Sequence, residues 1–181
     1  GLTKALATIA RRTSSSSNIA TNAATIKTDG KVFNASYVSG IWTGAVNAWT
    51  LDAYNNPSVL AWTASIPAFS TRKTKVFTYN GTTGDTFPTA TQTTSLDRST
   101  VGPVDYPVTG AKNADYIMGD QSGEGTAVGK LRVRDALLGD IVDSSPAYVD
   151  DTKTLYVGAN DGMLHAFDAG TGVEQFAYVP N

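Results

Sequence analysis

The sequence has no cysteine, a single histidine and few charged residues, and each shortage excludes a class of protein. Without cysteine, neither a disulfide framework nor a thiolate zinc site can form. Charged residues make up 17% of the 181, and the formal net charge of −2 argues against a nucleic-acid-binding surface. No apolar run approaches the roughly 20 residues that span a bilayer as a helix. The chain has the length of one domain, and its Thr, Ser, Gly and Ala content is typical of secreted β proteins.

The clearest pattern lies in the last forty or so residues. Two β-rich runs, Leu155–Ala159 and Met163–Asp168, flank the tripeptide Asn160-Asp161-Gly162. This tripeptide predicts a hairpin turn, because glycine supplies the positive φ that such a turn needs. A second turn at Ala169–Gly172 and a third run at Val173–Val179 follow. Three short antiparallel strands in series make most of a propeller blade.

Two phrases in this region, LLGDIVDSSPAYV and LYVGANDGMLHAFDAGTGVEQFAYVPN, occur together and in this order. They resemble the start of the C-terminal propeller of the PilY/PilC-type proteins, the adhesin and biogenesis factors at the tip of type IV pili. The resemblance implies an all-β fold, a partial β-propeller with quinoprotein-like blades and an incomplete ring. It also implies an extracellular location, at the pilus tip or on the bacterial cell surface.

The same resemblance implies partners and cofactors. The expected partners are the minor pilins at the pilus tip, a host or abiotic surface, and the rest of the propeller; nucleic acid and membrane spans are not expected. The family carries a calcium loop further along its propeller, so no cofactor or metal is expected in this segment and calcium is expected elsewhere in the parent protein.

The N-terminal region reads differently. Leu2, Leu6 and Ile9 recur at helical spacing and predict a short amphipathic helix ending near Arg12, and the Ser-rich stretch that follows predicts a flexible linker. Under the resemblance, residues 1–26 are the trailing helix and linker of a preceding von Willebrand A-like domain, and residues 27–181 are the first blades. The alternative is a frayed helix with no parent domain. Both ends stop inside expected elements, so we expect the sequence to be a fragment.

Further strands are predicted from aromatic and β-branched content. Pro146 lies within the strand predicted at Ile141–Val149, and a proline there suggests an edge position or a β-bulge. Thr82–Val108 is rich in Thr, Pro, Gly and Asp without a period, and we interpret it as a long insertion loop. The predicted strands are Val32–Val38, Ala45–Leu51, Val59–Ser65, Lys73–Tyr79, Ala114–Met118, Lys130–Val133 and Ile141–Val149.

A degenerate repeat links the front of the chain to its back. Ser36–Asp52 can be aligned with Thr154–Ala169, and the spacing of the two copies corresponds to two or three blades. A ring of four to eight blades cannot close with so few. In this alignment Gly44 matches Gly162, Ala48-Trp49 matches Ala166-Phe167, and Trp62 stands close to Phe176.

Candidate catalytic motifs are weak. Gly119–Lys130 has the wrong spacing for a phosphate-binding P-loop and is interpreted as a flexible turn. His165 and Asp168 are three residues apart on a predicted strand, so they point to opposite faces and do not form a dyad. Nothing marks Ser144 as a nucleophile, and a packed or capping histidine is predicted. The chain is therefore predicted not to be an enzyme.

Acidic residues and aromatics give the remaining candidates. The pairs Asp140 with Asp143 and Asp150 with Asp151 lack the spacing of a calcium loop. Weak binding of a single surface ion near Asp150 and Asp151 is the alternative. Trp49 and Trp62 are predicted blade-core aromatics. Trp42, beside a hairpin turn, is the candidate ligand-facing residue. The residues assigned to structural turns are Asn160, Asp161, Gly162, Asp168 and Gly172.

The resemblance therefore implies a non-enzymatic part of a type IV pilus tip adhesin that acts in pilus assembly and in surface or host-cell attachment. An alternative is a fragment of a quinoprotein-type dehydrogenase, because Gly158–Gly172 approaches the blade phrase GxNDGxLxAxDxxTG. A third reading is an outer-membrane assembly scaffold. The adhesion ligand and the blade count of the parent do not follow from the residues.

Overall fold

The computed structural model describes residues 14–21, 30–38, 40–100, 108–127 and 129–181. These residues divide into two compact units, each built from two stretches of chain. The first unit draws on Gly1–Ile66 and Leu138–Gln175, and the second on Pro67–Leu137 and Phe176–Asn181. The helix predicted for Leu2–Arg12 lies outside the described residues.

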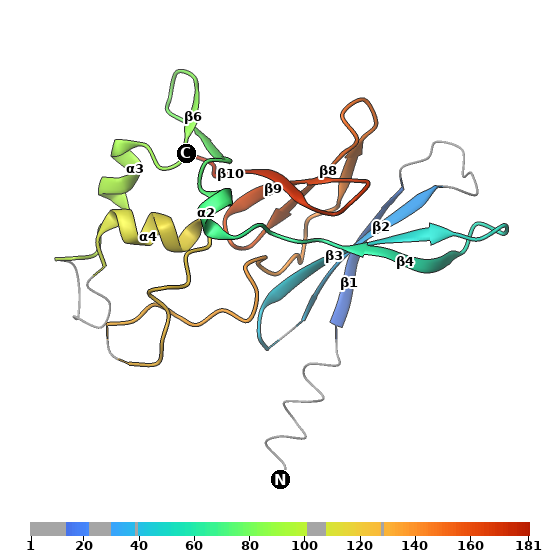
Figure 1. Cartoon of the computed structure of the whole chain (residues 1–181), viewed down its shortest axis with the longest axis horizontal. Coiled ribbons are helices and arrows are strands. Elements are labelled where there is room, and N and C mark those ends of the chain that lie inside the picture. The colour runs from blue at the N-terminus through green and yellow to red at the C-terminus, as the bar shows by residue number, and fades with distance from the viewer. Residues whose placement is uncertain (1–13, 22–29, 39, 101–107, 128) are drawn as a thin grey trace, which may run out of the picture. The chain divides into compact units, whose positions relative to one another are not determined.

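The first sheet of the first unit contains four antiparallel strands in the order β1-β2-β3-β4 (Figure 1). The strands predicted at Val32–Val38, Ala45–Leu51 and Val59–Ser65 are confirmed as β2, β3 and β4 with small shifts of their ends. The bounds are β1 Ser14–Thr21, β2 Lys31–Val38, β3 Thr43–Leu51 and β4 Pro57–Thr63.

Strand β1 corrects the prediction of a flexible linker at its start. Ser14 pairs with Val38 and Thr21 pairs with Val32, so the Ser-rich stretch is an edge strand of the sheet. The local composition is a weak indicator here, because β2 supplies a partner for the backbone of β1 and strand formation depends strongly on such tertiary context.

The second sheet of the first unit has the order β7-β8-β9-β10, and the first two residues of β10 belong to this unit. The hairpin predicted around Asn160-Asp161-Gly162 is confirmed as β8 and β9, which pair antiparallel. The strand predicted at Ile141–Val149 is shorter than expected, because Pro146 has no backbone N–H to donate to a neighbouring strand. Before Pro146, the Gly158 amide of β8 donates to the side-chain hydroxyl of Ser144 at 3.0 Å. The remainder of the predicted strand, β7, is the edge strand of this sheet. The bounds are β7 Ala147–Val149, β8 Thr154–Ala159, β9 Met163–Asp168 and β10 Glu174–Tyr178.

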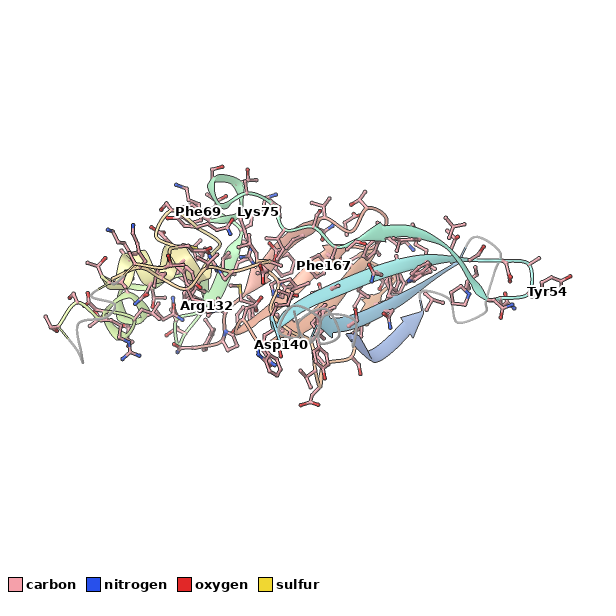
Figure 2. All side chains as sticks on the ribbon, turned by 90° about the horizontal axis from the view of Figure 1, so that it is seen from below. Tyr54, Phe69, Lys75, Arg132, Asp140 and Phe167 are labelled. Atoms are coloured by element: carbon pink, nitrogen blue, oxygen red, sulfur yellow. The ribbon has the colours of Figure 1, made fainter. Side chains whose placement is uncertain are left out.

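One apolar core lies between these two sheets. Phe33 pairs across the first sheet with Ala48, and Leu155 pairs across the second with Phe167; all four side chains are fully buried. Phe167, on β9, is labelled in Figure 2. The Phe33 ring also lies 5.7 Å from the ring of Trp62. The rest of the buried core is Ala35, Val46, Leu138, Ile141, Val157 and Ala169.

The second unit combines a small sheet with short helices. Its strands have the order β6-β5-β10, with β5 parallel to β10 and antiparallel to β6. Thr82–Val108, predicted as a loop without structure, contains strand β6 and helix α3, so that prediction is wrong for its described residues. The elements are α2 Phe69–Arg72, β5 Val76–Tyr79, β6 Gly84–Thr86, α3 Ala90–Ser95 and α4 Gly110–Ile117.

The strand predicted at Ala114–Met118 is also wrong, because these residues belong to α4 and its C-cap. The Thr109 hydroxyl accepts from the amide of Lys112 and caps the helix, and Ala114 and Met118, one turn apart, are buried. Helix α3 starts with a capping box at Thr89 and lies beside α4 (Figure 1). Close approach requires Gly110, since a Cβ there would lie 1.7 Å from the Thr93 carbonyl oxygen of α3.

The loop from Gly119 to Arg134 completes the second unit. The strand predicted at Lys130–Val133 is reduced to one bridge between Leu131 and Glu124. Arg134 holds the loop, because its Nε lies 2.7 Å from Glu124 Oε1 and its guanidinium lies 3.6 Å from the Tyr116 ring centroid. Over the described residues as a whole, strands hold far more of the chain than helices, so the predicted all-β class is confirmed. None of the helices in the described ranges is long and apolar enough to cross a bilayer.

Candidate functional site

The only histidine is held between two carboxylates inside the first unit. His165 is fully buried, its Nδ1 lies 2.7 Å from Glu174 Oε1, and its Nε2 lies 3.0 Å from Asp161 Oδ2. The imidazole stacks on Phe167, with ring centroids 5.8 Å apart. We call Asp161, His165 and Glu174 the histidine clamp.

Local geometry explains how these three residues meet. Asp161 lies in the turn before β9, where Gly162 has a φ of 89° and the Met163 amide donates to Asp161 Oδ1 at 3.1 Å. Because side chains alternate along a strand, His165 points to the same face as Met163 and toward Asp161. Glu174 comes from β10, the neighbour of β9 in the sheet.

A second segment fastens onto the same turn. The Gly139 amide donates to Asp161 Oδ2 at 2.9 Å, and the side-chain amide of Asn160 donates to Asp140 Oδ2 at 2.8 Å. The backbone amide of Asn160 also donates to the Asp140 carbonyl at 3.0 Å. Gly139-Asp140, from the first phrase that carried the family resemblance, is thus hydrogen-bonded to Asn160-Asp161, from the second.

Two glycines allow this close approach. A Cβ on Gly139 would lie 2.4 Å from the Asp161 amide nitrogen, and a Cβ on Gly44 would lie 2.1 Å from the Gly139 carbonyl oxygen. Gly44 also donates its amide to Leu138 at 3.0 Å. The segment Leu138–Asp140 is therefore wedged between β3 and the β8–β9 turn, with no space for side chains at its contact points.

The clamp favours a protonated imidazole. Burial alone lowers the pKa of His165, but hydrogen bonds and charge from Asp161 and Glu174 outweigh it and raise the pKa above the ordinary 6.5. Burial raises the pKa of Asp161, and the hydrogen bond and charge of His165, with the Gly139 and Met163 amides, lower it below 3.8 overall. A cation between two carboxylates is the arrangement these shifts describe.

This geometry leaves the histidine without a face for a substrate. Both ring nitrogens are occupied by carboxylates, and the side chain has no exposed surface. Asp168, considered as its partner from the sequence, instead accepts from the Gly170 and Thr171 amides at 3.0 and 2.8 Å and shapes the next turn.

Sequence reasoning missed the pairing with Asp161 and Glu174. A signal for the first was present, since residues four apart on an extended segment share a face. Glu174 lies nine residues away on the next strand, and its contact depends on how β10 pairs with β9.

Two of the other acidic candidates, Asp150 and Asp140, have protein partners. Asp150 Oδ1 accepts from the Tyr148 hydroxyl at 2.9 Å and from Lys153 Nζ at 2.6 Å. Asp140, labelled in Figure 2, accepts from Asn160 as described. Over the described ranges, no group of three or more His, Asp or Glu residues is arranged to hold a metal ion.

The three tryptophans have three different positions. Trp62 is buried, donates its indole N–H to the Ala169 carbonyl at 3.1 Å, and packs so tightly on Gly172 that a Cβ there would lie 2.5 Å from the ring. Trp49 is only half-buried and lies outside the core, because Ala48 takes the inward position. In the first hairpin it is therefore Ala48, and not Trp49, that faces the core, as Phe167 does in the second hairpin.

Trp42 is an exposed aromatic at a strained position. It is 57% exposed and has a φ of 55°, a left-handed conformation that favours glycine. Among the aromatics that the structure describes, the most exposed is Tyr54, 85% exposed in the β3–β4 turn, where it stands at the outer end of the connection (Figure 2). The nine-residue strand β3 separates the two residues by roughly 30 Å at ~3.3 Å per residue, so they do not share one site.

Comparison with known proteins identifies the relatives of this chain. A PilY1 type IV pilus biogenesis factor homologue of Xylella fastidiosa is 32% identical over 189 residues, which cover 90% of this chain. The chain is a homologue of the PilY1 factors. The PilY1 factor of Pseudomonas aeruginosa strain UCBPP-PA14 is 39% identical over 98 residues, 39% of the chain, and another X. fastidiosa PilY1 homologue is 26% identical over 98% of it.

The match to the PilY1 factors is a match to a segment of them. The chain spans 15% of the length of the first X. fastidiosa relative, 17% of the other and 8% of the P. aeruginosa relative. No family model matches the sequence, and no solved structure matches it.

Proposed function

We propose that the chain is a non-enzymatic part of a type IV pilus tip adhesin, acting in pilus assembly and in attachment to a host or abiotic surface. The observation that carries the proposal is the similarity to a PilY1 biogenesis factor over 90% of the chain. The proposed location is extracellular, at the pilus tip or on the bacterial surface, and the proposed partners are minor pilins, the contacted surface and the rest of the parent protein.

The proposed architecture is the start of a β-propeller. Two hairpins with the same inward pairing support it: Phe33 opposite Ala48 in the first sheet, and Leu155 opposite Phe167 in the second. Adjacent sheets that pack face to face through such pairs are what neighbouring blades require. A rigid arrangement of this kind presents its turns, with Trp42 and Tyr54, to a ligand.

The absence of enzyme activity belongs to the proposal. The histidine clamp supports it, because His165 is enclosed by Asp161 and Glu174 and has no exposed atom to offer a substrate. A quinone titration with a dye-linked turnover assay tests it; we expect neither binding nor turnover, and saturable quinone binding with turnover would favour the dehydrogenase alternative. Calcium is proposed only for other parts of the parent.

The assembly role is tested by segment exchange in a bacterium whose own pilus factor is of the PilY1 type. The matching segment of that factor is deleted, or replaced by this chain, and the cell-surface pili are sheared off and quantified. Deletion is expected to lower the pilus yield at least tenfold, and replacement is expected to restore it.

The matched control is a replacement by the chain carrying Gly139→Val, which we expect to disrupt the wedge beneath the β8–β9 turn. This variant should not restore pili, and immunoblotting distinguishes loss of assembly from loss of the protein. Full piliation of the deletion strain would overturn the assembly role. Attachment is scored separately with Tyr54→Ala and Trp42→Ala; normal piliation with unchanged attachment in both would remove the turns from the adhesive surface.

A further inference from the structure

The turn between β5 and β6 carries an asparagine followed by a glycine. Asn80-Gly81 is the single place in the sequence where glycine follows asparagine. Both residues are exposed, Gly81 has a φ of 99°, and a Cβ at Gly81 would meet nothing within 4 Å. Within the described part of the chain, the Gly81 amide donates no hydrogen bond. The backbone nitrogen that follows Asn80 is therefore open to solvent and is not shielded by a side chain of its own residue.

Backbone amides hold the side-chain oxygen of Asn80. The Thr82 and Thr83 amides each donate to Asn80 Oδ1 at 3.0 Å. On the other side of the carboxamide, Asn80 Nδ2 donates to Asp85 Oδ2 at 3.1 Å. Two N–H donors aimed at one carbonyl oxygen are the arrangement that stabilises negative charge on that oxygen during acyl transfer.

We propose that Asn80 modifies itself through attack of the Gly81 nitrogen on the Asn80 side-chain carbonyl. The new N–Cγ bond closes a five-membered succinimide ring, and the Cγ–Nδ2 bond breaks to release ammonia. The proton of the Gly81 amide passes to solvent, and the departing nitrogen takes a proton from water. A second water molecule then opens the ring and leaves aspartate or isoaspartate at this position. Water is the co-reactant, and no electrons are transferred to or from the chain.

The two amide donors favour this reaction because they bind the tetrahedral intermediate more strongly than the starting amide. Attack places negative charge on Asn80 Oδ1, and hydrogen bonds to a charged acceptor are roughly twice as strong as those to a neutral one. Only such a difference lowers the barrier. Other asparagines are placed less favourably. Asn56 precedes Pro57, which has no N–H to lose. Asn34 and Asn47 pair with each other inside the β2–β3 ladder.

The product weakens the hairpin that contains it. Conversion to aspartate replaces the N–H donor that faces Asp85 with a second carboxylate, and like charges at this distance repel. Conversion to isoaspartate adds a methylene to the backbone beside the last pair of the hairpin, Tyr79 with Gly84. This self-modification is a property beyond the proposed pilus role and does not depend on it.

The first test is mass spectrometry of the purified, folded chain during incubation at mildly alkaline pH. We expect the peptide that contains Asn80 to gain the mass difference between an amide and a carboxylic acid before any other asparagine reacts. Gly81→Ala puts a Cβ beside the attacking nitrogen and should slow this gain at least about tenfold. The matched control is Gly84→Ala, where a Cβ also meets nothing within 4 Å, and its rate should stay within about twofold of the wild type.

A second variant covers the case in which Gly81→Ala distorts the turn. Asn80→Gln would have to close a six-membered ring, so its peptide should keep its mass over the period in which the wild type reacts. Circular dichroism verifies that the variants are folded. An Asn80 peptide that keeps its mass in the wild type would overturn the proposal, and so would a gain that is equally fast in Gly81→Ala.

The consequence for the hairpin is tested with Asn80→Asp, which has the side chain of one product. Hydrogen exchange of the β5–β6 amides should be roughly fivefold faster than in the wild type, as expected for a loss of local stability near the thermal scale of a weak contact. Asp85→Asn removes the facing carboxylate, and in that background Asn80→Asp should change the exchange rate by less than about twofold. Equal exchange in Asn80→Asp and the wild type would contradict the repulsion between the two carboxylates.

Discussion

The first unit contains two hairpins built alike but completed differently. In β2–β3 the inward pair next to Phe33 and Ala48 is Ala35 opposite Val46; in β8–β9 the pair next to Leu155 and Phe167 is Val157 opposite His165. The place of an apolar valine is thus taken by a histidine held between two carboxylates.

The turns differ in the same sense. The residue just before β3 is Trp42, with a φ of 55°, and the residue just before β9 is Gly162, with a φ of 89°. The second hairpin uses the residue that this backbone conformation favours and ties its turn to Leu138–Asp140. The first hairpin accepts strain and leaves an aromatic side chain exposed. The second hairpin is therefore anchored at its turn, whereas the first exposes a side chain to solvent at the same place.

The largest effect should come from removing the charge at the centre of the second hairpin. His165→Val copies the apolar solution of the first hairpin but leaves Asp161 and Glu174 without their shared cation. We expect the free energy of unfolding to fall by roughly 3–5 kcal/mol, the usual result when one member of a buried ionic cluster is removed. Urea unfolding measures it, with Leu164→Val on an exposed position of β9 as the control. A loss below about 1 kcal/mol would show that the clamp is not a stabilising ionic cluster.

A smaller loss should follow from filling the wedge between the hairpins. Gly139→Ala forces a Cβ to within 2.4 Å of the Asp161 amide, so the segment must shift. Overpacking of this kind costs about 1–3 kcal/mol. Gly84→Ala, in open space, is the control and should change stability by less than about 0.5 kcal/mol. Equal stability of the two variants would contradict the close approach.

Changing pH removes a proton from the clamp rather than a side chain. Because the folded-state pKa of His165 is raised, its contribution to stability is complete below 6.5 and is lost as pH rises through the folded value. Because the pKa of Asp161 is lowered, its contribution is complete above 3.8 and is lost as pH falls through the folded value. The stability difference between wild type and His165→Val should therefore peak between these two pH values. A difference that does not vary with pH would argue against an imidazolium.

The smallest effects concern the two turns and should have opposite signs. Trp42→Gly relieves a left-handed conformation and should raise the free energy of unfolding by up to about 1 kcal/mol, whereas Gly162→Ala introduces that conformation and should lower it by about 1 kcal/mol. Thermal unfolding of both variants gives the comparison. Destabilisation by Trp42→Gly would mean that the indole packs more than its exposure indicates.

Strands rich in aromatic and β-branched residues could be predicted from the sequence. The β8–β9 turn could be predicted too, because Gly162 in Asn160-Asp161-Gly162 readily adopts the positive φ that the turn needs. Helix α4 could not be predicted, because the apolar residues Ala114 and Met118 are compatible with a strand or a helix. The N-cap at Thr109 favours the helix. Strand β1 could not be predicted, because its Ser-rich composition has low strand propensity and the strand depends on backbone pairing with β2.

Only part of the histidine clamp could be predicted from the sequence. The burial of His165 follows from its place in an apolar strand, but its contact with Glu174 requires the pairing of two strands. The alignment of the two stretches gave Trp49 the place of a core aromatic, whereas the register of the sheet puts Ala48 in the inward position.

The order in which the chain is made has a consequence for the first unit. Its stretches Gly1–Ile66 and Leu138–Gln175 are separated by seventy-one intervening residues, Pro67–Leu137, all of which belong to the second unit. During translation, strands β1–β4 are therefore synthesised well before strands β7–β9, whose sheet covers their apolar side. The apolar face around Phe33 remains exposed to water until nearly the whole segment has been synthesised. An early β1–β4 sheet is thus the nascent species that a chaperone or secretion partner would have to shield.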